Sequence, residues 1–167
     1  RISRQYATVC SSIHVETNCL MIVSLREHKE LIELHTALLP FYEKMPYKKK
    51  TLNEDKWAFT WLNLIETGVG KILGLLDEDD IIGGIGLINS PSLEDGALVV
   101  QEAFWFVDEK HRGGGIKLFR AAEKYAKQIG AERLMMIHLE TSMPEKLKKF
   151  YKAMNYKLAE TTYIKEL

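Results

Sequence analysis

Three consecutive glycines, Gly113 to Gly115, are the residues whose spacing points most directly to chemistry. They end a polar loop that begins at Asp108, and a segment with helical spacing follows at once, from Ile116 to Ile129. At the start of a helix, glycines leave the backbone uncrowded, so consecutive N–H groups can face one anion while the helix dipole adds to their field. The pattern indicates a phosphate cradle. The alternative is a flexible turn ahead of a helix.

This loop matches neither of the two common nucleotide motifs. It lacks the Lys-Ser/Thr ending of the P-loop, and no glycine stands three residues after Gly115, as G-x-G-x-x-G requires. Its surroundings favour the cradle, because the β-rich segment Ala97–Val107 precedes it and ligands collect beyond the carboxyl ends of parallel strands. A nucleotide-binding module of another α/β family stays open as an alternative.

The rest of the chain predicts the elements that hold this loop. Pro40 is expected to end a first helix that starts at Arg26, and Thr51 with Glu54 forms a capping-box pattern ahead of a second helix that ends at Gly68. Aspartates form the tip of an expected hairpin. The predicted strands are Leu20–Leu25, Lys71–Leu76, Ile81–Asn89, Ala97–Val107, Arg133–Leu139 and Leu158–Ile164, and a last helix starts at Pro144.

This order predicts one mixed α/β domain with a largely antiparallel sheet of six strands, or of seven if Thr8–Val15 adds an edge strand. About four helices flank it. Only the crossover from Val99 to Leu139 is expected to join two parallel strands, with a right-handed connection. We expect the domain to span residues 19–167. Residues 1–18 show no clean period and are expected to be an extension, either disordered or not native.

Composition excludes several classes of protein. The 167 residues are 46% hydrophobic, and 23 basic residues balance 23 acidic ones, so nothing pulls the whole chain toward nucleic acid or an anionic membrane. Cys10 and Cys19 indicate neither a disulfide framework nor a zinc module, so no metal and a cytoplasmic location are expected. No apolar run reaches the length of a membrane span.

Two motifs resemble those of the GNAT superfamily of acyl-CoA-dependent N-acyltransferases. Val107–Lys117 is similar to the family's strand end, V-x-P, followed by R/Q-x-x-G-x-G/A at a helix start. Phe150–Tyr156 resembles the late helix motif l-Y-x-x-x-G-F/Y. The aromatic run before the loop and the chain end Tyr-x-Lys-Glu-Leu look like the members found in bacteriophages. The resemblance implies a GNAT-like sheet that splays between its fourth and fifth strands.

The resemblance also implies the reaction, which is direct transfer of an acetyl group from acetyl-CoA to a primary amine in a ternary complex. A backbone N–H of Phe106 or Val107 would stabilise the thioester oxygen. Tyr151 matches the general acid that protonates the leaving thiolate, and its alternative role is a core aromatic. The residues implied to bind acetyl-CoA are Phe106, Val107, Arg112, Gly113, Gly114, Gly115, Ile116 and Lys117.

Three positions depart from the family pattern. Glu109 replaces the proline of the strand motif, Pro144 replaces the usual asparagine before the late helix, and Lys117 replaces a small residue on the cradle helix. Lys117 either points away from the diphosphate or makes a charged contact with it. These departures motivate a second hypothesis, a weak or inactive CoA-binding or interaction domain of the same fold.

Glu102 is the candidate general base. Two-residue alternation places it on the same side of its strand as Val100, Phe104 and Phe106. On so apolar a strand, desolvation would raise the pKa of the carboxyl toward the range useful for taking a proton from an amine. The alternative is an exposed carboxylate at an open edge. Two histidines are lesser candidates for the base, His111 and His138.

The acceptor stays open, because the first two helices and the hairpin, which set acceptor choice in the resembled family, carry the least recognisable pattern. An amine on a small molecule or on a peptide or protein fits equally. Trp57, Phe59 and Trp61 are able to line an acceptor pocket, although core packing is the better interpretation of Trp61. A homodimer is the other partner that the resemblance suggests.

Overall fold

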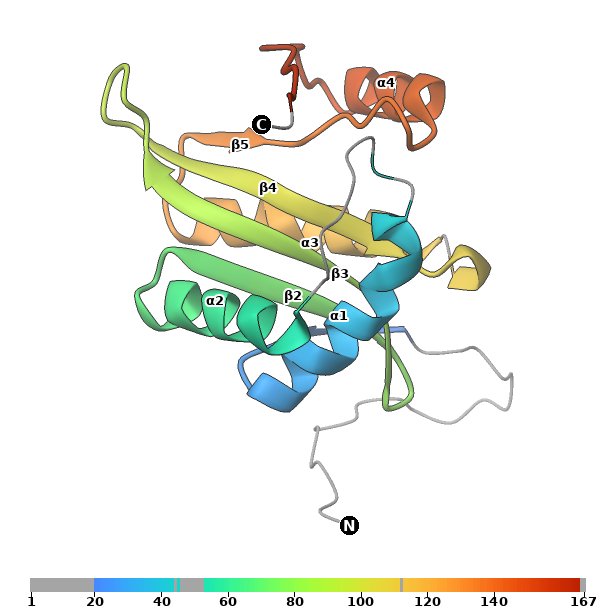
Figure 1. Cartoon of the computed structure of the whole chain (residues 1–167). Coiled ribbons are helices and arrows are strands. Elements are labelled where there is room, and N and C mark those ends of the chain that lie inside the picture. Colours follow the sequence, from blue (N-terminus) through green and yellow to red (C-terminus); the bar gives the residue numbers. More distant parts are fainter. Residues whose placement is uncertain (1–19, 44, 46–52, 112, 166–167) are drawn as a thin grey trace, which may run out of the picture.

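The computed structural model describes residues 20–43, 45, 53–111 and 113–165 (Figure 1). Four features of the sequence interpretation lie outside these residues: the predicted extension, the two cysteines, Thr51 and Arg112. Within the described ranges, no helix combines the length and the apolar character that crossing a bilayer requires.

A five-stranded sheet forms the centre of the fold, in the spatial order β1-β2-β3-β4-β5. The first four strands are antiparallel neighbours, and β5 runs parallel to β4, as predicted for the crossover. The strands are β1 (Met21–Ser24), β2 (Gly70–Asp77), β3 (Asp80–Pro91), β4 (Leu98–Val107) and β5 (Arg133–Met135).

The prediction of six or seven strands is wrong for the described chain. β5 ends at Met135, four residues before the predicted end, and residues 157–165 form no strand. Leu158 and Tyr163, which made this last segment resemble a strand, are both largely exposed. The physical reason is that β propensity acts through side-chain packing on a neighbouring strand, and a three-residue β5 offers little to pair with.

Helices cover both faces of the sheet (Figure 1). α1 (His28–Tyr42) and α2 (Glu54–Glu66) pack on one face, over a core that includes Leu34, Trp61 and Phe104. α3 (Gly114–Gln128) packs on the other face, over a core that includes Leu75 and Val100. α4 (Pro144–Ala153) lies at the β5 end of the sheet. Each layer therefore buries its own apolar stripe against the sheet.

Two helix ends differ from the predictions. α1 continues through Pro40 to Tyr42, because a proline removes only one hydrogen bond while Phe41 and Tyr42 hold the last turn by packing on the core. α2 begins at Glu54, and its cap is Asn53, whose side-chain oxygen accepts the N–H of Lys56 at 2.7 Å.

A bulge in β4 reverses the faces of this strand. Gly86 of β3 pairs with Phe104, but the next residue, Leu87, pairs with Glu102, so Ala103 has no partner on β3. Paired residues share a face of the sheet, and Leu87 packs in the core under α3, so Glu102 faces the α3 side. Phe104 packs on the α1 and α2 side instead. The prediction that Glu102 shares a face with Phe104 and Phe106 is therefore wrong.

Candidate functional site

The predicted cradle lies at the start of α3. Gly113 is the N-cap residue, and the first N–H groups of a helix have no partner within it. A Cβ added at Gly113 would meet nothing within 4 Å, and Ile116 is 49% exposed. Among the described residues, nothing therefore fills the space beside Gly113. This arrangement fits an anion such as a diphosphate, which bare amides and the helix dipole both favour.

The three glycines of the cradle do different work. A Cβ on Gly114 would lie 2.3 Å from Cδ2 of Leu75, so this glycine lets α3 approach β2 closely. At Gly115 the nearest atom would be Cζ2 of Trp105 at 3.5 Å, an ordinary contact. Gly113 and Gly115 are therefore the two glycines of this loop where a Cβ fits without a clash.

The loop before α3 is tied to the tip of the β2–β3 hairpin. Nε2 of His111, in the short helix η1 (Glu109–His111), lies 3.2 Å from Oδ2 of Asp77. The N–H of Asp108 donates to the carbonyl of Ile82 at 2.8 Å. His111 thus has a structural partner at the hairpin tip, and the two-residue turn between Asp77 and Asp80 confirms the predicted hairpin.

Lys117 points toward the start of β1. Its Nζ donates to the carbonyl oxygen of Leu20 at 3.4 Å. The ammonium group of Lys117 thus has a hydrogen-bond partner in the protein backbone. A Cβ on Gly114 would lie 3.3 Å from Cδ1 of the same Leu20, so this bond keeps Lys117 beside the start of α3, and both alternatives for Lys117 stay open.

The fourth and fifth strands part as the predicted splay requires. Their parallel pairing covers three residues of each strand and ends at Gln101 and Met135. β4 continues to Val107, so its last six residues have no β5 partner. Phe106 and Val107 lie in this stretch and pair with β3 alone, while the Phe106 ring is buried in the α1–α2 core, its centre 6.4 Å from that of the Phe41 ring.

Glu102 lies at the point where the two strands part. Its side chain is 5% exposed, and Oε2 accepts the backbone N–H of Ile137 at 3.1 Å. Burial raises the pKa of this carboxyl to about 8, although the bond from Ile137 partly opposes the shift. The predicted burial of Glu102 is confirmed, and its alternative as an exposed edge carboxylate is wrong.

Tyr151 of α4 reaches the same backbone position from the other side. Its hydroxyl donates to the carbonyl oxygen of Ile137 at 2.9 Å, and the residue is 9% exposed. Burial raises the pKa of the phenol, and the charges of Glu102 and Tyr156 add to the rise. The phenol therefore keeps its proton at every ordinary pH. Glu102 and Tyr151 lie 49 positions apart in the sequence, and each was predicted from a different pattern. In the structure, both bond to the backbone of Ile137.

Ile137 is the member of this site that sequence reasoning missed. It contributes only its backbone N–H and carbonyl, and such groups leave no signature in residue types. Its neighbour His138, a lesser candidate for the base, is half-buried, and its Nε2 has no hydrogen-bond partner among the described residues.

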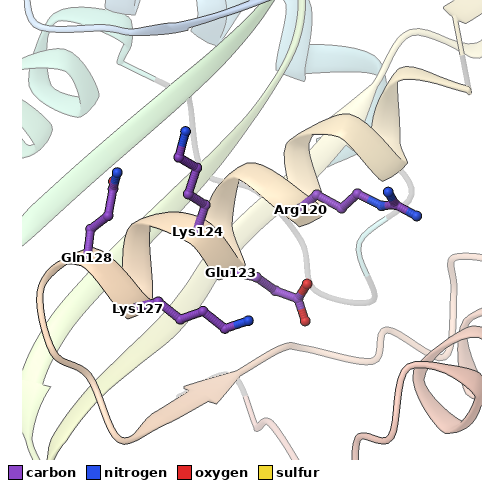
Figure 2. A pocket seen from close by; sticks show the side chains of 5 residues that line it. All are labelled: Arg120, Glu123, Lys124, Lys127 and Gln128. Atoms are coloured by element: carbon purple, nitrogen blue, oxygen red, sulfur yellow. The ribbon is translucent and has the colours of Figure 1, made fainter.

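The outer face of α3 has a separate hollow of about 430 Å³ (Figure 2). It is lined by Arg120, Glu123, Lys124, Lys127 and Gln128. Figure 2 shows these side chains leaving the helix in different directions rather than converging on one point. The hollow holds no catalytic arrangement. The described residues also contain no group of three or more His, Cys, Asp or Glu placed to hold a metal ion.

A protein-family model described as the acetyltransferase (GNAT) family matches residues 28–156. Among solved structures, an aminoglycoside acetyltransferase from an uncultured soil metagenomic sample is 18% identical, with a TM-score of 0.70 over 90% of this chain and 97% of that chain. A ribosomal-protein-alanine N-acetyltransferase from Brucella melitensis is 18% identical, with a TM-score of 0.69 over 89% and 100%.

A Trypanosoma brucei acetyltransferase is 19% identical, with a TM-score of 0.67 over 89% of this chain and 99% of that chain. At these identities, the three structures establish similarity of fold alone. No curated protein matches the chain.

Proposed function

Because the chain belongs to the acetyltransferase (GNAT) family, we propose that it transfers an acetyl group from acetyl-CoA to a primary amine in a ternary complex. The observation that carries this proposal is the meeting of Glu102 and Tyr151 at Ile137, where β4 and β5 separate. A carboxyl that titrates near pH 8 and a protonated phenol there supply the base and the acid that amine acetylation needs. The family match removes the ground for a nucleotide-binding module of another α/β class.

The cradle amides and the separated strands would hold acetyl-CoA. The cofactor supplies the acetyl group, activated as a thioester. The N–H groups at the start of α3, beside Gly113 and Gly115, would bind its diphosphate, with Arg112 as the predicted charged partner. A backbone N–H of Phe106 or Val107 would stabilise the negative charge that develops on the thioester oxygen, an effect worth about 3 kcal/mol of barrier.

Glu102 would take the proton of the attacking amine. With a pKa of about 8, its carboxyl is largely protonated at pH 7 and becomes a competent base as the pH rises through 8. Because the side chain is 5% exposed and accepts the N–H of Ile137, we propose that the proton of the amine reaches it through an intervening water.

Tyr151 would return a proton to the departing sulfur. Its O–H is donated to the carbonyl of Ile137, so the hydroxyl must first rotate away from that oxygen, at a net cost of about 1 kcal/mol. A phenol is a weaker acid than a thiol, so the transfer requires a thiolate that is held close and poorly hydrated. Burial of Tyr151 between Phe150 and Tyr156 supports such an environment.

We propose an amine-bearing small molecule or a peptide or protein amine as the acceptor. Two of the similar structures are those of an aminoglycoside acetyltransferase and a ribosomal-protein-alanine N-acetyltransferase, and their names indicate one acceptor of each class on this fold. A cytoplasmic location, a homodimer and kinship with the bacteriophage-type members stay predictions.

Release of CoA thiol in the presence of acetyl-CoA and an amine panel tests the proposal. The panel should include aminoglycosides, polyamines and peptides with a free N-terminus. Product mass must show one added acetyl group on the amine. Turnover should fall in Glu102→Gln, and the rising limb of the wild-type pH profile near pH 8 should disappear with it.

An acceptor of low pKa is needed for the pH profile, because an ordinary amine loses its own proton over the same range. Glu94→Gln, which makes the same chemical change on an exposed turn, is the matched control. Thermal stabilisation by acetyl-CoA without thiol release from any amine would refute turnover and support the inactive CoA-binding domain instead.

A further inference from the structure

A second hollow lies at the opposite end of α3 from the cradle. Its volume is about 250 Å³, and its lining includes Leu25, Arg26, Ile65, Lys71 and Tyr125. Tyr125 stands eleven residues beyond Gly114 on α3, which is about 16 Å along the helix axis. The hollow is therefore separate from the site proposed for acetyl-CoA.

Two cationic residues, Arg26 and Lys71, line this hollow, and the carboxylate of Glu30 accepts the backbone N–H of Arg26 at 2.9 Å rather than its guanidinium. No carboxylate of the described chain lies within 4 Å of the Lys71 ammonium or the Arg26 guanidinium. Burial lowers the pKa of Lys71, and the positive charge of Arg26 lowers it further. Two positive charges that face one cavity repel each other, which costs free energy. An anion between them would attract both and offset this repulsion.

Tyr125 adds a neutral donor to the lining of this hollow. The Lys71 ammonium bonds the hydroxyl of Ser24 and lies 5.7 Å from the centre of the Tyr125 ring. Both amide protons of Asn89 are used, one to the carbonyl of Gly68 at 3.0 Å and one to the Tyr125 hydroxyl oxygen at 2.7 Å. Because Tyr125 accepts from Asn89, its own hydroxyl proton is left to donate elsewhere.

We propose that this hollow, lined by Arg26, Lys71 and Tyr125, is a binding site for a small doubly charged oxyanion of the phosphate class. Two cations and a phenol donor match the acceptor oxygens of such an ion. The volume equals that of about eight waters at ~30 Å³ each, which exceeds the need of inorganic phosphate. The remaining volume is bordered by the apolar side chains of Leu25 and Ile65, which would contact the organic group of a phosphate ester.

An NMR titration with inorganic phosphate tests the site, at ionic strength held constant with potassium chloride. The reporters are the Tyr125 ring signals and the Lys71 side-chain signals, and the Ile116 amide reports separately on the cradle. We expect saturable shifts at Tyr125 and Lys71. Shifts of equal size in chloride alone, or none that saturate, would overturn the proposal.

Charge-removing variants decide whether the two cations bind the ion. Lys71→Met and Arg26→Gln should each weaken phosphate binding at Tyr125 at least about tenfold, because each removes a charge-assisted hydrogen bond. Lys29→Met is the matched control, since it removes one charge that is 80% exposed and paired with Glu33 at 3.7 Å, and it should change the affinity by less than about twofold. Unchanged affinity in a folded Arg26→Gln protein would refute the site even if Lys71→Met fails to fold.

Discussion

Glu102→Gln should make the protein more stable at alkaline pH, although it removes the proposed base. In the folded chain the Glu102 carboxyl holds its proton up to a pKa of about 8, whereas its ordinary value is 4.5. Between these pH values the unfolded chain releases the proton and the folded chain keeps it. Unfolding therefore becomes easier as the pH rises through this window, and glutamine has no proton to release.

The size of the effect follows from the same two pKa values. A window from 4.5 to about 8 spans 3.5 pH units, and each is worth about 1.4 kcal/mol, so the limit is about 5 kcal/mol. Only the part of the window above pH 5 enters a comparison of pH 8.5 with pH 5, and water that enters around an ionised Glu102 would reduce the cost further, so we expect a difference of about 2 to 4 kcal/mol. For a domain of this length, that corresponds to roughly 5 to 15 °C in Tm.

Urea unfolding followed by tryptophan fluorescence at five pH values between 5 and 9 measures the difference. The free energy of unfolding of Glu102→Gln minus that of wild type should grow with pH and level off above pH 8. Glu94→Gln should run parallel to wild type throughout. A difference for Glu102→Gln that stays constant across the range would show that the carboxyl ionises normally in the folded protein, and the reasoning about its role as a base would fail with it.

Three further changes test the other parts of the site. Tyr151→Phe should lower kcat about a hundredfold or more with little change in the KM for acetyl-CoA, and an unchanged kcat in steady-state assays would remove its role as the acid. Gly114→Ala should cost about 1 to 3 kcal/mol in urea unfolding because of its contact with the leucine beneath it, whereas Gly113→Leu should keep the Tm and weaken acetyl-CoA binding in calorimetry. His111→Gln should lose up to about 1 kcal/mol with the Asp77 contact but leave the pH profile of kcat in place, and a displaced profile would restore His111 as a candidate base.

Local signals predicted the elements around the site well. The glycines before Ile116 mark a helix start, and the aspartates at the hairpin tip mark a turn, because both patterns act through the backbone preferences of a few neighbouring residues. The structure places a helix start and a two-residue turn at these positions. Burial of Glu102 was also predictable, since apolar residues surround it along β4.

Features that depend on distant partners were not predictable. Alternation placed Glu102 with Phe104, but the unpaired Ala103 reverses the faces, and nothing in the residue types marks that position. The role of Gly114 depends on Leu75, which lies on another element. The predicted last strand failed for a related reason, because strand propensity decides nothing where a neighbouring strand is absent.

The single unpaired residue in β4 has a consequence for how this strand tolerates changes in length. Deleting Ala103 would remove the bulge, and Glu102 and Phe104, then direct neighbours, would keep their opposite faces by plain alternation, so the aromatic side chains of Phe104 and Phe106 would stay in the α1–α2 core. Loss of this one residue is therefore a length change that the strand absorbs without turning any side chain over, whereas a second loss would find no bulge left to absorb it and would turn the residues on one side of the deletion to the opposite face.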